Sequence, residues 1–356
     1  MIFCNAPSLQ QTAAKEERPL KPLQGANQSS YSVGSERTMQ NRRTLLKDGF
    51  LAGARKGWSG FVWMMKILVP ISLLTAVLAW SGWIEKGNFL IQPIMSLLSL
   101  PAMAALPLLI GTLTGIYGAI AAMVVLPFTK GQMSLIAIFL LIAHNLIQEG
   151  VIQGKSGLHP LKATLFRLIA ATLTVMVAAR FLDVTPTAAL VAKTSVSVSQ
   201  SFGAMMGKWL LAMSQLGVKI FVIIMTLLIL LEVLKSLGWI NQIVKLSRPL
   251  LKCLGLSEKA GILWMTAAIF GLAYGATVIV EEAKEGHLGR EELEGLHLSI
   301  GINHALVEDP ALFLALGVNA FWLWVPRLIT AMLAVRLLTL WQHTSKKLQL
   351  SNISNP

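Results

Sequence analysis

The sequence predicts an all-α polytopic membrane protein that consists of two repeated units with broken or re-entrant helices. Two observations support this fold class. Of the 356 residues, 54% are hydrophobic and only 13% are charged, and the mean hydropathy is +0.65. Several apolar runs also reach the roughly 20 residues that a helix needs to cross a bilayer. A soluble domain of this length carries far more surface charge, so the composition argues against one.

Roughly eight apolar runs qualify as membrane spans, about four in each half of the chain. They are 61–83, 102–128, 134–152, 163–182, 218–237, 262–280, 296–318 and 321–340. Several of them contain Gly or Pro, and such runs can be re-entrant where the backbone is buried in protein or lines a cavity.

The amino-terminal region differs in kind from the rest. Residues 1–40 are rich in Gln, Ser, Asn and Pro without a hydrophobic period, which predicts disorder. No signal peptide is evident, and Met39 is an alternative start, in which case residues 1–38 have no function. Residues 41–57 form a basic juxtamembrane segment, which places the amino terminus on the cytoplasmic side of an inner membrane. The same clustering beside spans accounts for the net charge of +13 without a nucleic-acid partner.

The chain contains an internal repeat. Three segments return later in the chain at one constant shift: GTLTG at 111–115 as GLAYG at 271–275, HNLIQEG at 144–150 as HALVEDP at 304–310, and RLIAATLTV at 167–175 as RLITAMLAV at 327–335. Repeated halves in a polytopic protein are typical of transporters, with the working site between the halves. The predicted organisation is a first unit at 58–182, a linker at 183–207, a second unit at 208–340 and a tail at 341–356.

The charge pattern favours opposite orientations of the two units. One basic residue, Lys86, follows the Trp80–Trp83 segment, whereas the equivalent stretch after Trp239 carries four basic residues between 245 and 259. Equivalent loops with opposite basic bias indicate inverted-topology repeats. For inverted units, the chain must cross the membrane an odd number of times between equivalent residues of the two units. Four spans per unit give an even number. A re-entrant hairpin within 89–128 would reconcile the two, and both alternatives stay open.

Ionisable residues interrupt the apolar stretch GINHALVEDPALFLALG. His304 and Glu308 are four residues apart and share one face of a continuous helix, with Asp309 about 100° further round. Pro310 removes a backbone donor and disfavours helix at the preceding residue. We therefore expect the helix to break directly after this polar group.

The first unit shows the same arrangement, with an uncharged Gln where the second unit has Glu308. His144 is followed by Gln148 on the same face, then by Glu149 and the permissive Gly150. Charged side chains in the bilayer core cost at least about 2.5–3.5 kcal/mol each, so they usually face a protein interior or a cavity. We expect a polar cavity between the units that binds a small solute or ion. Its candidate residues are His144, Gln148, Glu149, Asn303, His304, Glu308 and Asp309.

Purely structural explanations, without a bound ligand, remain open for these residues and for several weaker candidates. The His304 segment could be a solvated helix end, although its recurrence in both units favours a site. Thr114 and Tyr274 lie between the repeated glycines and are secondary cavity candidates. Glu281 and Glu282 are further secondary candidates, although the charged loop that follows them favours an ordinary solvated turn. Arg167 and Arg327, at equivalent span starts, are expected to snorkel to lipid headgroups.

An enzyme is not expected. His304 and Asp309 resemble the H-x4-D signature of glycerolipid acyltransferases, which leaves a membrane acyltransferase as a remote alternative. The first unit has Glu149 in place of the Asp, and no His-Glu-x-x-His zinc-protease motif occurs. The chain has no phosphate-binding loop, and no cofactor is expected.

The pattern resembles the nucleoside recognition (Gate) domain, which is shared by the membrane part of ferrous iron transporter B, spore maturation proteins A and B, and concentrative nucleoside transporters. In each half an apolar span leads to a Gly-aromatic pair (Trp83 or Trp239), a Pro-containing amphipathic segment (Pro93 or Pro249) and a Gly-rich span. The resemblance covers most of 58–340. It implies a multi-pass inner-membrane protein involved in transport, without implying a nucleoside substrate.

The departures from that family matter for the substrate. The GTPase of ferrous iron transporter B is absent, and Cys253 falls in a basic amphipathic segment, which argues against iron transport. His304, Glu308 and Asp309 still offer nitrogen and oxygen ligands to a divalent cation. The alternative from the spore-maturation resemblance is a membrane assembly factor. The expected partners are membrane lipid and a small solute or ion, and a homo-oligomer remains open.

Overall fold

The computed structural model describes residues 29–86, 88–155, 157–185, 201–270, 279–282 and 288–353. All regular structure in this part is helical, which confirms the all-α class. The chain divides into two compact units, Met1–Thr44 and Leu45–Pro356, and the architecture below is that of the second. Helix α1 (Ser29–Trp80) begins in the first unit. The predicted disorder is therefore wrong for residues 29–40, where Glu36, Arg37, Met39 and Gln40 are good helix formers.

Five helices are long and apolar enough to cross a membrane. They are Arg42–Trp80 within α1, Lys130–Lys155 (interrupted at His144 and Asn145), Pro160–Ala178 (α8), Phe202–Ser236 (α10) and Ala320–Thr344 within α17 (Ala320–Ile353). A bent pair brings the number to six if it counts as one span. Eight continuous spans are thus not found among the described residues, because several apolar runs are divided by turns that hydropathy alone does not register.

The predicted run at 102–128 is one of the divided segments. The bent pair, Phe89–Leu97 with Ala102–Thr114, turns by 81° and forms either a broken span or a re-entrant loop. The turn contains Ser99, with a φ of 55°, and Leu100 just before Pro101, a position where helix is disfavoured. Helix α3 (Asn88–Leu97) leads into this turn, and α4 (Ala105–Thr114) and α5 (Ile116–Val125) follow it.

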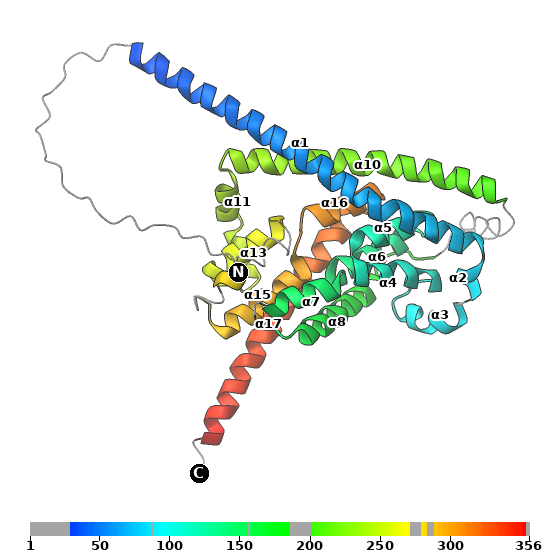
Figure 1. Ribbon diagram of the computed structural model, residues 1–356. Helices are drawn as coiled ribbons and strands as arrows, with labels where there is room; N and C mark the ends of the chain where they lie inside the picture. Colours follow the sequence, from blue (N-terminus) through cyan, green and yellow to red (C-terminus); the bar gives the residue numbers. More distant parts are fainter. Residues whose placement is uncertain are drawn as a thin grey trace, which may run out of the picture. The chain divides into compact units, whose positions relative to one another are not determined.

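Helices α1 and α10 run antiparallel along each other (Figure 1). Gly49 of α1 lies against Ser236 at the end of α10, and the Trp80 ring contacts Phe202 at its start, with centroids 5.4 Å apart. Between these ends, a Cβ on Gly53 would come within 2.5 Å of the Ile229 Cα. The small residues on α1 thus allow the two backbones to approach closely, as in many membrane helix pairs.

The buried centre is formed by α6 (Lys130–Ala143), α8, α15 (Arg290–Asn303) and α17, which pack on one another. The span that contains α6 is 72% buried, whereas the other four spans are 22–39% buried. Helix α6 is therefore surrounded by protein. Under the constant shift of the repeat, α15 begins and ends at the positions equivalent to the two ends of α6, and α17 begins at the position equivalent to the start of α8.

The starts of α6 and α15 are capped in an equivalent way. The Oε1 of Gln132 accepts from the Thr129 N–H at 3.0 Å, and the Oε2 of Glu292 accepts from the Gly289 N–H at 3.1 Å. Shorter helices complete the described part: α2 (Trp83–Lys86), α7 (Leu146–Lys155), α11 (Ile240–Leu246), α12 (Arg248–Cys253), α13 (Glu258–Phe270) and α16 (Glu308–Ala315).

Candidate functional site

Two helices break at equivalent histidines in the buried centre. Helix α6 ends before His144, which is extended (φ −94°, ψ 163°), and Asn145 then adopts a φ of 47°. Helix α15 ends before His304, which is also extended (φ −70°, ψ 161°), and Ala305 has the same φ of 47°. Each histidine therefore sits at the carboxyl end of one half-helix, just before the chain turns into α7 or α16.

These breaks lie earlier than the sequence analysis expected. Helix α7 continues through Gly150, and Pro310 lies in the first turn of α16. The first turn of a helix has no partner for its N–H groups, so a proline there removes nothing. The predicted break positions at Gly150 and Pro310 are therefore wrong, although each half does contain a break beside its polar group.

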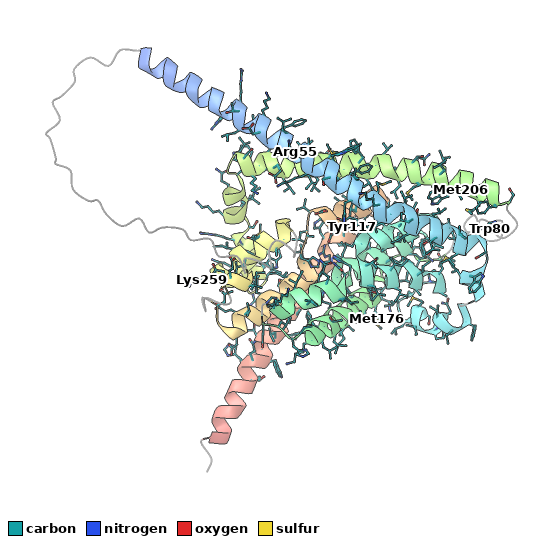
Figure 2. The ribbon with its side chains drawn as sticks, viewed as in Figure 1. Arg55, Trp80, Tyr117, Met176, Met206 and Lys259 are labelled. Atoms are coloured by element: carbon teal, nitrogen blue, oxygen red, sulfur yellow. The ribbon has the colours of Figure 1, made fainter. Side chains whose placement is uncertain are left out.

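The early breaks also change which carboxyl groups face the histidines. Gln148 is exposed and accepts from the Asn145 side chain at 3.1 Å. Glu308 is half-buried and accepts from the Tyr117 hydroxyl at 2.8 Å, a contact that joins α5 to α16. Tyr117 is labelled in Figure 2. The expected i, i+4 pairs of His144 with Gln148 and of His304 with Glu308 are thus not formed, because no continuous helix connects their members.

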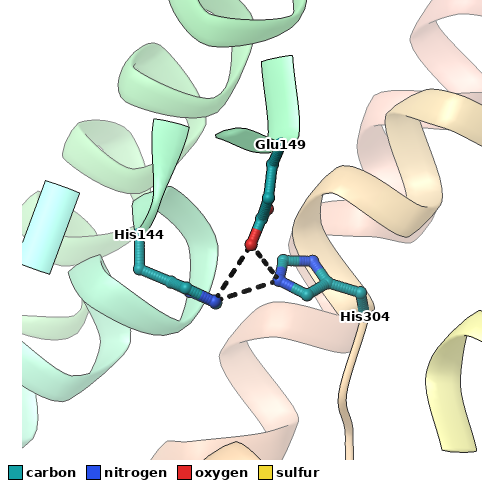
Figure 3. Close-up of side chains that lie close together, drawn as sticks. All are labelled: His144, Glu149 and His304. Carbon is teal, nitrogen blue, oxygen red and sulfur yellow. Dashed lines mark hydrogen bonds and ion pairs between the residues drawn. The ribbon is translucent and has the colours of Figure 1, made fainter. Parts of the chain in front are cut away.

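Three buried side chains instead form a compact cluster, which we call the His-Glu-His cluster: His144, Glu149 and His304 (Figure 3). The Nε2 atoms of the two histidines are 3.2 Å apart. The Oε1 of Glu149 is 3.2 Å from each of them. Nitrogen and oxygen atoms at this spacing could hold a metal ion, and the two halves of the chain both contribute.

Arg167 holds the carboxylate of this cluster in place. Its Nη1 donates to the Oε2 of Glu149 at 2.5 Å, while its Nε and Nη2 donate to the carbonyls of Ile142 and His144 at 2.7 and 3.0 Å. The guanidinium therefore satisfies both the buried carboxylate and the carbonyls at the end of α6, which have no intrahelical donor.

Arg327 occupies the equivalent place in the second half. Its Nε and Nη2 donate to the carbonyls of Ile302 and His304 at 3.1 and 3.0 Å. Arg167 and Arg327 are 1% and 0% exposed. The predicted snorkelling of these arginines to lipid headgroups is therefore wrong, because the helix breaks supply buried carbonyls for them.

Asp309 and Asn303 complete the surroundings of the cluster. The Oδ2 of Asp309 lies 3.6 Å from the Nε2 of His144, and it is a buried oxygen without a hydrogen-bond partner in the described part. Asn303 is fully buried and donates to the Arg327 carbonyl at 3.4 Å, while its Oδ1 has no such partner. Polar acceptors left open in a buried place favour a positively charged or hydrogen-bonding ligand.

The secondary candidates are not part of the cluster. Thr114 is exposed and donates to the carbonyl of Ile110, one turn back on its own helix. Glu281 is exposed, and Glu282 borders a separate cavity of about 340 Å³ next to Lys259. Tyr274 lies outside the described residues.

Sequence reasoning missed the structural roles of Arg167, Arg327 and Tyr117. A signal for the arginines was present, because both stand in the repeated RLI segment, at the same shift that relates the two histidines. A polar residue that recurs with a site in both halves is a candidate to support that site. Tyr117 has no equivalent signal, because its partner Glu308 is 191 positions away in the sequence.

The backbone at Ala305 leads to a first prediction. A left-handed conformation costs an L-residue other than Gly roughly 1–2 kcal/mol, whereas Gly loses about 0.5–1 kcal/mol more entropy on folding. We therefore expect Ala305→Gly to raise the free energy of unfolding by about 0.5–1 kcal/mol. Chemical unfolding of the wild type and the variant in mixed micelles measures this change in the free energy of unfolding. Ala305→Val is the opposing variant and should destabilise, and a destabilising Ala305→Gly would contradict the strain at this position.

One curated relative and the apolar helices establish the class of the protein. The chain is 27% identical over 306 residues to the uncharacterized membrane protein YvoD of Bacillus subtilis (strain 168), and the match covers 85% of this chain and 96% of that protein. No protein-family model matches the chain, and no solved structure matches it. With five helices that can span a bilayer, the chain is an all-helical membrane protein.

Proposed function

We propose that the protein is a transporter or permease for a small solute or ion, with the His-Glu-His cluster at the junction of two repeated units. One observation carries this proposal: two helices break at equivalent residues of the repeat, and the two breaks bring His144 and His304 together. In secondary transporters, broken helices from two repeats form the substrate or ion site near the middle of the membrane.

The direction of α1 and α10 supports inverted repeats. Both helices end at the equivalent Gly-Trp segments, so the repeat makes them counterparts. Equivalent helices related by an axis along the membrane normal run parallel, whereas an axis in the membrane plane makes them antiparallel. Gly49 lies against Ser236 and Trp80 against Phe202, so these two run antiparallel. With antiparallel counterparts, the chain crosses the membrane an odd number of times between the start of α1 and the start of α10. The opposite basic bias of the equivalent loops requires the same.

The electrostatics of the breaks favour a cationic ligand. The carboxyl ends of α6 and α15 meet at the cluster, and each helix end carries roughly half a negative charge. Three carboxylates, of Glu149, Glu308 and Asp309, lie near two guanidinium groups, of Arg167 and Arg327. A cation would balance the remaining negative charge.

The acyltransferase alternative has less support from the same contacts. That chemistry needs Asp309 to orient His304 as a base. The Nε2 of His304 instead faces Glu149, and Asp309 approaches His144 of the other half. The assembly-factor alternative predicts that the cluster residues can be replaced without loss of function.

A flux measurement tests the proposed function. Purified protein in liposomes is given a pH gradient, labelled uridine, or Mn²⁺ with an enclosed indicator dye. We expect uptake of at least one of these probes, which falls at least tenfold in Glu149→Gln and His304→Ala and is unchanged in His343→Ala, an exposed histidine outside the cluster. Uptake equal to empty liposomes for every probe, or equal rates in all variants, would refute the proposal.

A further inference from the structure

The tautomers of the two histidines leave the cluster without a donor. The Nδ1 of His144 is 2.8 Å from the Leu140 carbonyl, and the Nδ1 of His304 is 3.0 Å from the Ile300 carbonyl. A carbonyl only accepts, so each Nδ1 carries the hydrogen, and in the neutral ring the Nε2 then presents a lone pair. The two Nε2 atoms and the Glu149 Oε1 are thus three acceptors directed at one point.

Three acceptors at 3.2 Å from one another in a buried place repel unless a positive centre lies between them. Either a proton or a metal ion can fill that role. We propose that the His-Glu-His cluster binds one divalent transition-metal ion of the Zn²⁺ type, held by His144 Nε2, His304 Nε2 and Glu149 Oε1. The site itself stands on this geometry, whereas the role of the ion as cargo or coupling ion rests on the proposed transport function.

The spacing matches the coordination geometry of such an ion. Ligand atoms about 2.0–2.1 Å from a tetrahedral zinc ion are about 3.3–3.4 Å apart, close to the observed spacing. Two imidazoles and one carboxylate favour Zn²⁺ or a neighbouring transition metal over Mg²⁺ and Ca²⁺, which prefer oxygen alone.

The groups behind the ligands support a metal rather than a proton. Metal-bound histidines usually donate their second ring N–H to a carbonyl or carboxylate, as both rings do here. Arg167 fixes the Oε2 of Glu149 and leaves its Oε1 for the ion. These contacts orient all three ligands before an ion arrives.

Asp309 provides the second, independent observation. Its Oδ2 is buried, has no hydrogen-bond partner in the described part, and lies 3.6 Å from the Nε2 of His144. An unpaired carboxylate oxygen in such a place is costly, and an ion beside it would remove that cost. We assign Asp309 to the fourth position, either directly or through a water molecule. Two histidines and Glu149 then supply three ligands, and Asp309 or its water completes four-coordination.

Metal titration of the purified full-length protein tests the site. The protein is treated with a chelator, freed of affinity tags and titrated in detergent with Zn²⁺ by calorimetry and with Co²⁺ by visible absorption. We expect one ion per chain, Co²⁺ bands typical of four-coordination, and affinities at least tenfold lower in His144→Ala, His304→Ala and Glu149→Gln. Asp309→Asn should lower the affinity by a smaller factor, and His343→Ala should bind as the wild type does.

Folding of the variants is checked separately, because a lost affinity has meaning only in folded protein. Glu149→Gln retains an oxygen that can accept from Arg167, so it is the conservative variant. Zn²⁺ should raise the melting temperature of the wild type and not that of this variant, since a ligand of the native state adds stability. No stoichiometric binding by the wild type, or equal binding by His304→Ala, would overturn the site.

The outcomes for the site and for transport are distinguishable. Stoichiometric Zn²⁺ binding without uptake of any probe would refute the transport function and leave the metal site in place. Uptake of uridine or protons by a protein that binds no metal would refute the metal site and leave transport in place. Uptake of Mn²⁺ that falls together with Zn²⁺ affinity across the variants would support both.

Discussion

Replacing Arg167 with Met should lower the free energy of unfolding by about 3–5 kcal/mol, the usual cost of removing one partner of a buried ion pair. The guanidinium is 1% exposed and donates to the Glu149 carboxylate and to two carbonyls at the end of α6. Without it, a buried charge and two buried acceptors lose their donors at once. Equilibrium unfolding in mixed micelles measures the loss.

Two further variants isolate the cause. Arg336→Met removes an exposed guanidinium that donates a long hydrogen bond, at 3.3 Å, to the Lys252 carbonyl. This variant should change the free energy of unfolding by less than about 1 kcal/mol. The double variant Arg167→Met/Glu149→Gln should recover part of the loss, because no unpaired charge remains. Full recovery of stability would show that the hydrogen bonds to the carbonyls contribute nothing to it. No recovery would exclude the broken ion pair as the cause of the loss in Arg167→Met.

Replacing Gly53 with Ala should cost about 1–3 kcal/mol, because α1 and α10 would have to move apart. A Cβ at this position would lie 2.5 Å from the Ile229 Cα and 2.9 Å from the Leu228 carbonyl oxygen, and backbone atoms cannot turn away as a side chain can. Unfolding in mixed micelles, with cross-linking between cysteines placed on α1 and α10, would report both the stability and the separation.

Gly60 is the matched control on the same helix. A Cβ there would meet only the Leu228 Cδ1, at 3.8 Å, which is ordinary contact. Gly60→Ala should therefore be neutral or stabilising, since Ala exceeds Gly in helix propensity by up to about 1 kcal/mol. Equal effects of the two substitutions would contradict the close approach of the helices at Gly53.

The equivalent carboxylates of the two halves, Glu149 and Asp309, differ by one methylene group. In the first half, Arg167 reaches Glu149 and closes an ion pair. In the second half the shorter Asp309 takes the equivalent position, and both its Oδ2 and the Nη1 of Arg327 lack a hydrogen-bond partner in the described part. The first half therefore fixes its carboxylate through an ion pair, whereas the carboxylate of the second half lacks that contact.

Much of the candidate site could be predicted from the repeat. Its constant shift made His144 and His304 counterparts, and it aligned Glu149 with Asp309. Because repeated halves often build one site at their junction, both histidines were expected to line a polar cavity between the units. The choice of Gln148 and Glu308 as their partners was wrong, because it assumed a continuous helix through residues that turn at Asn145 and Ala305.

Composition and periodicity by themselves determined that this chain is a helical membrane protein and where its polar groups lie along the sequence, because the bilayer imposes its length and apolarity on every span. Only the tertiary structure decided which of those groups meet. Helix breaks at His144 and His304 are stabilised by arginines from α8 and α17, more than twenty residues away in the chain. Such long-range hydrogen bonds leave no local pattern, so the identity of the carboxylate at the cluster depended on how the two halves pack.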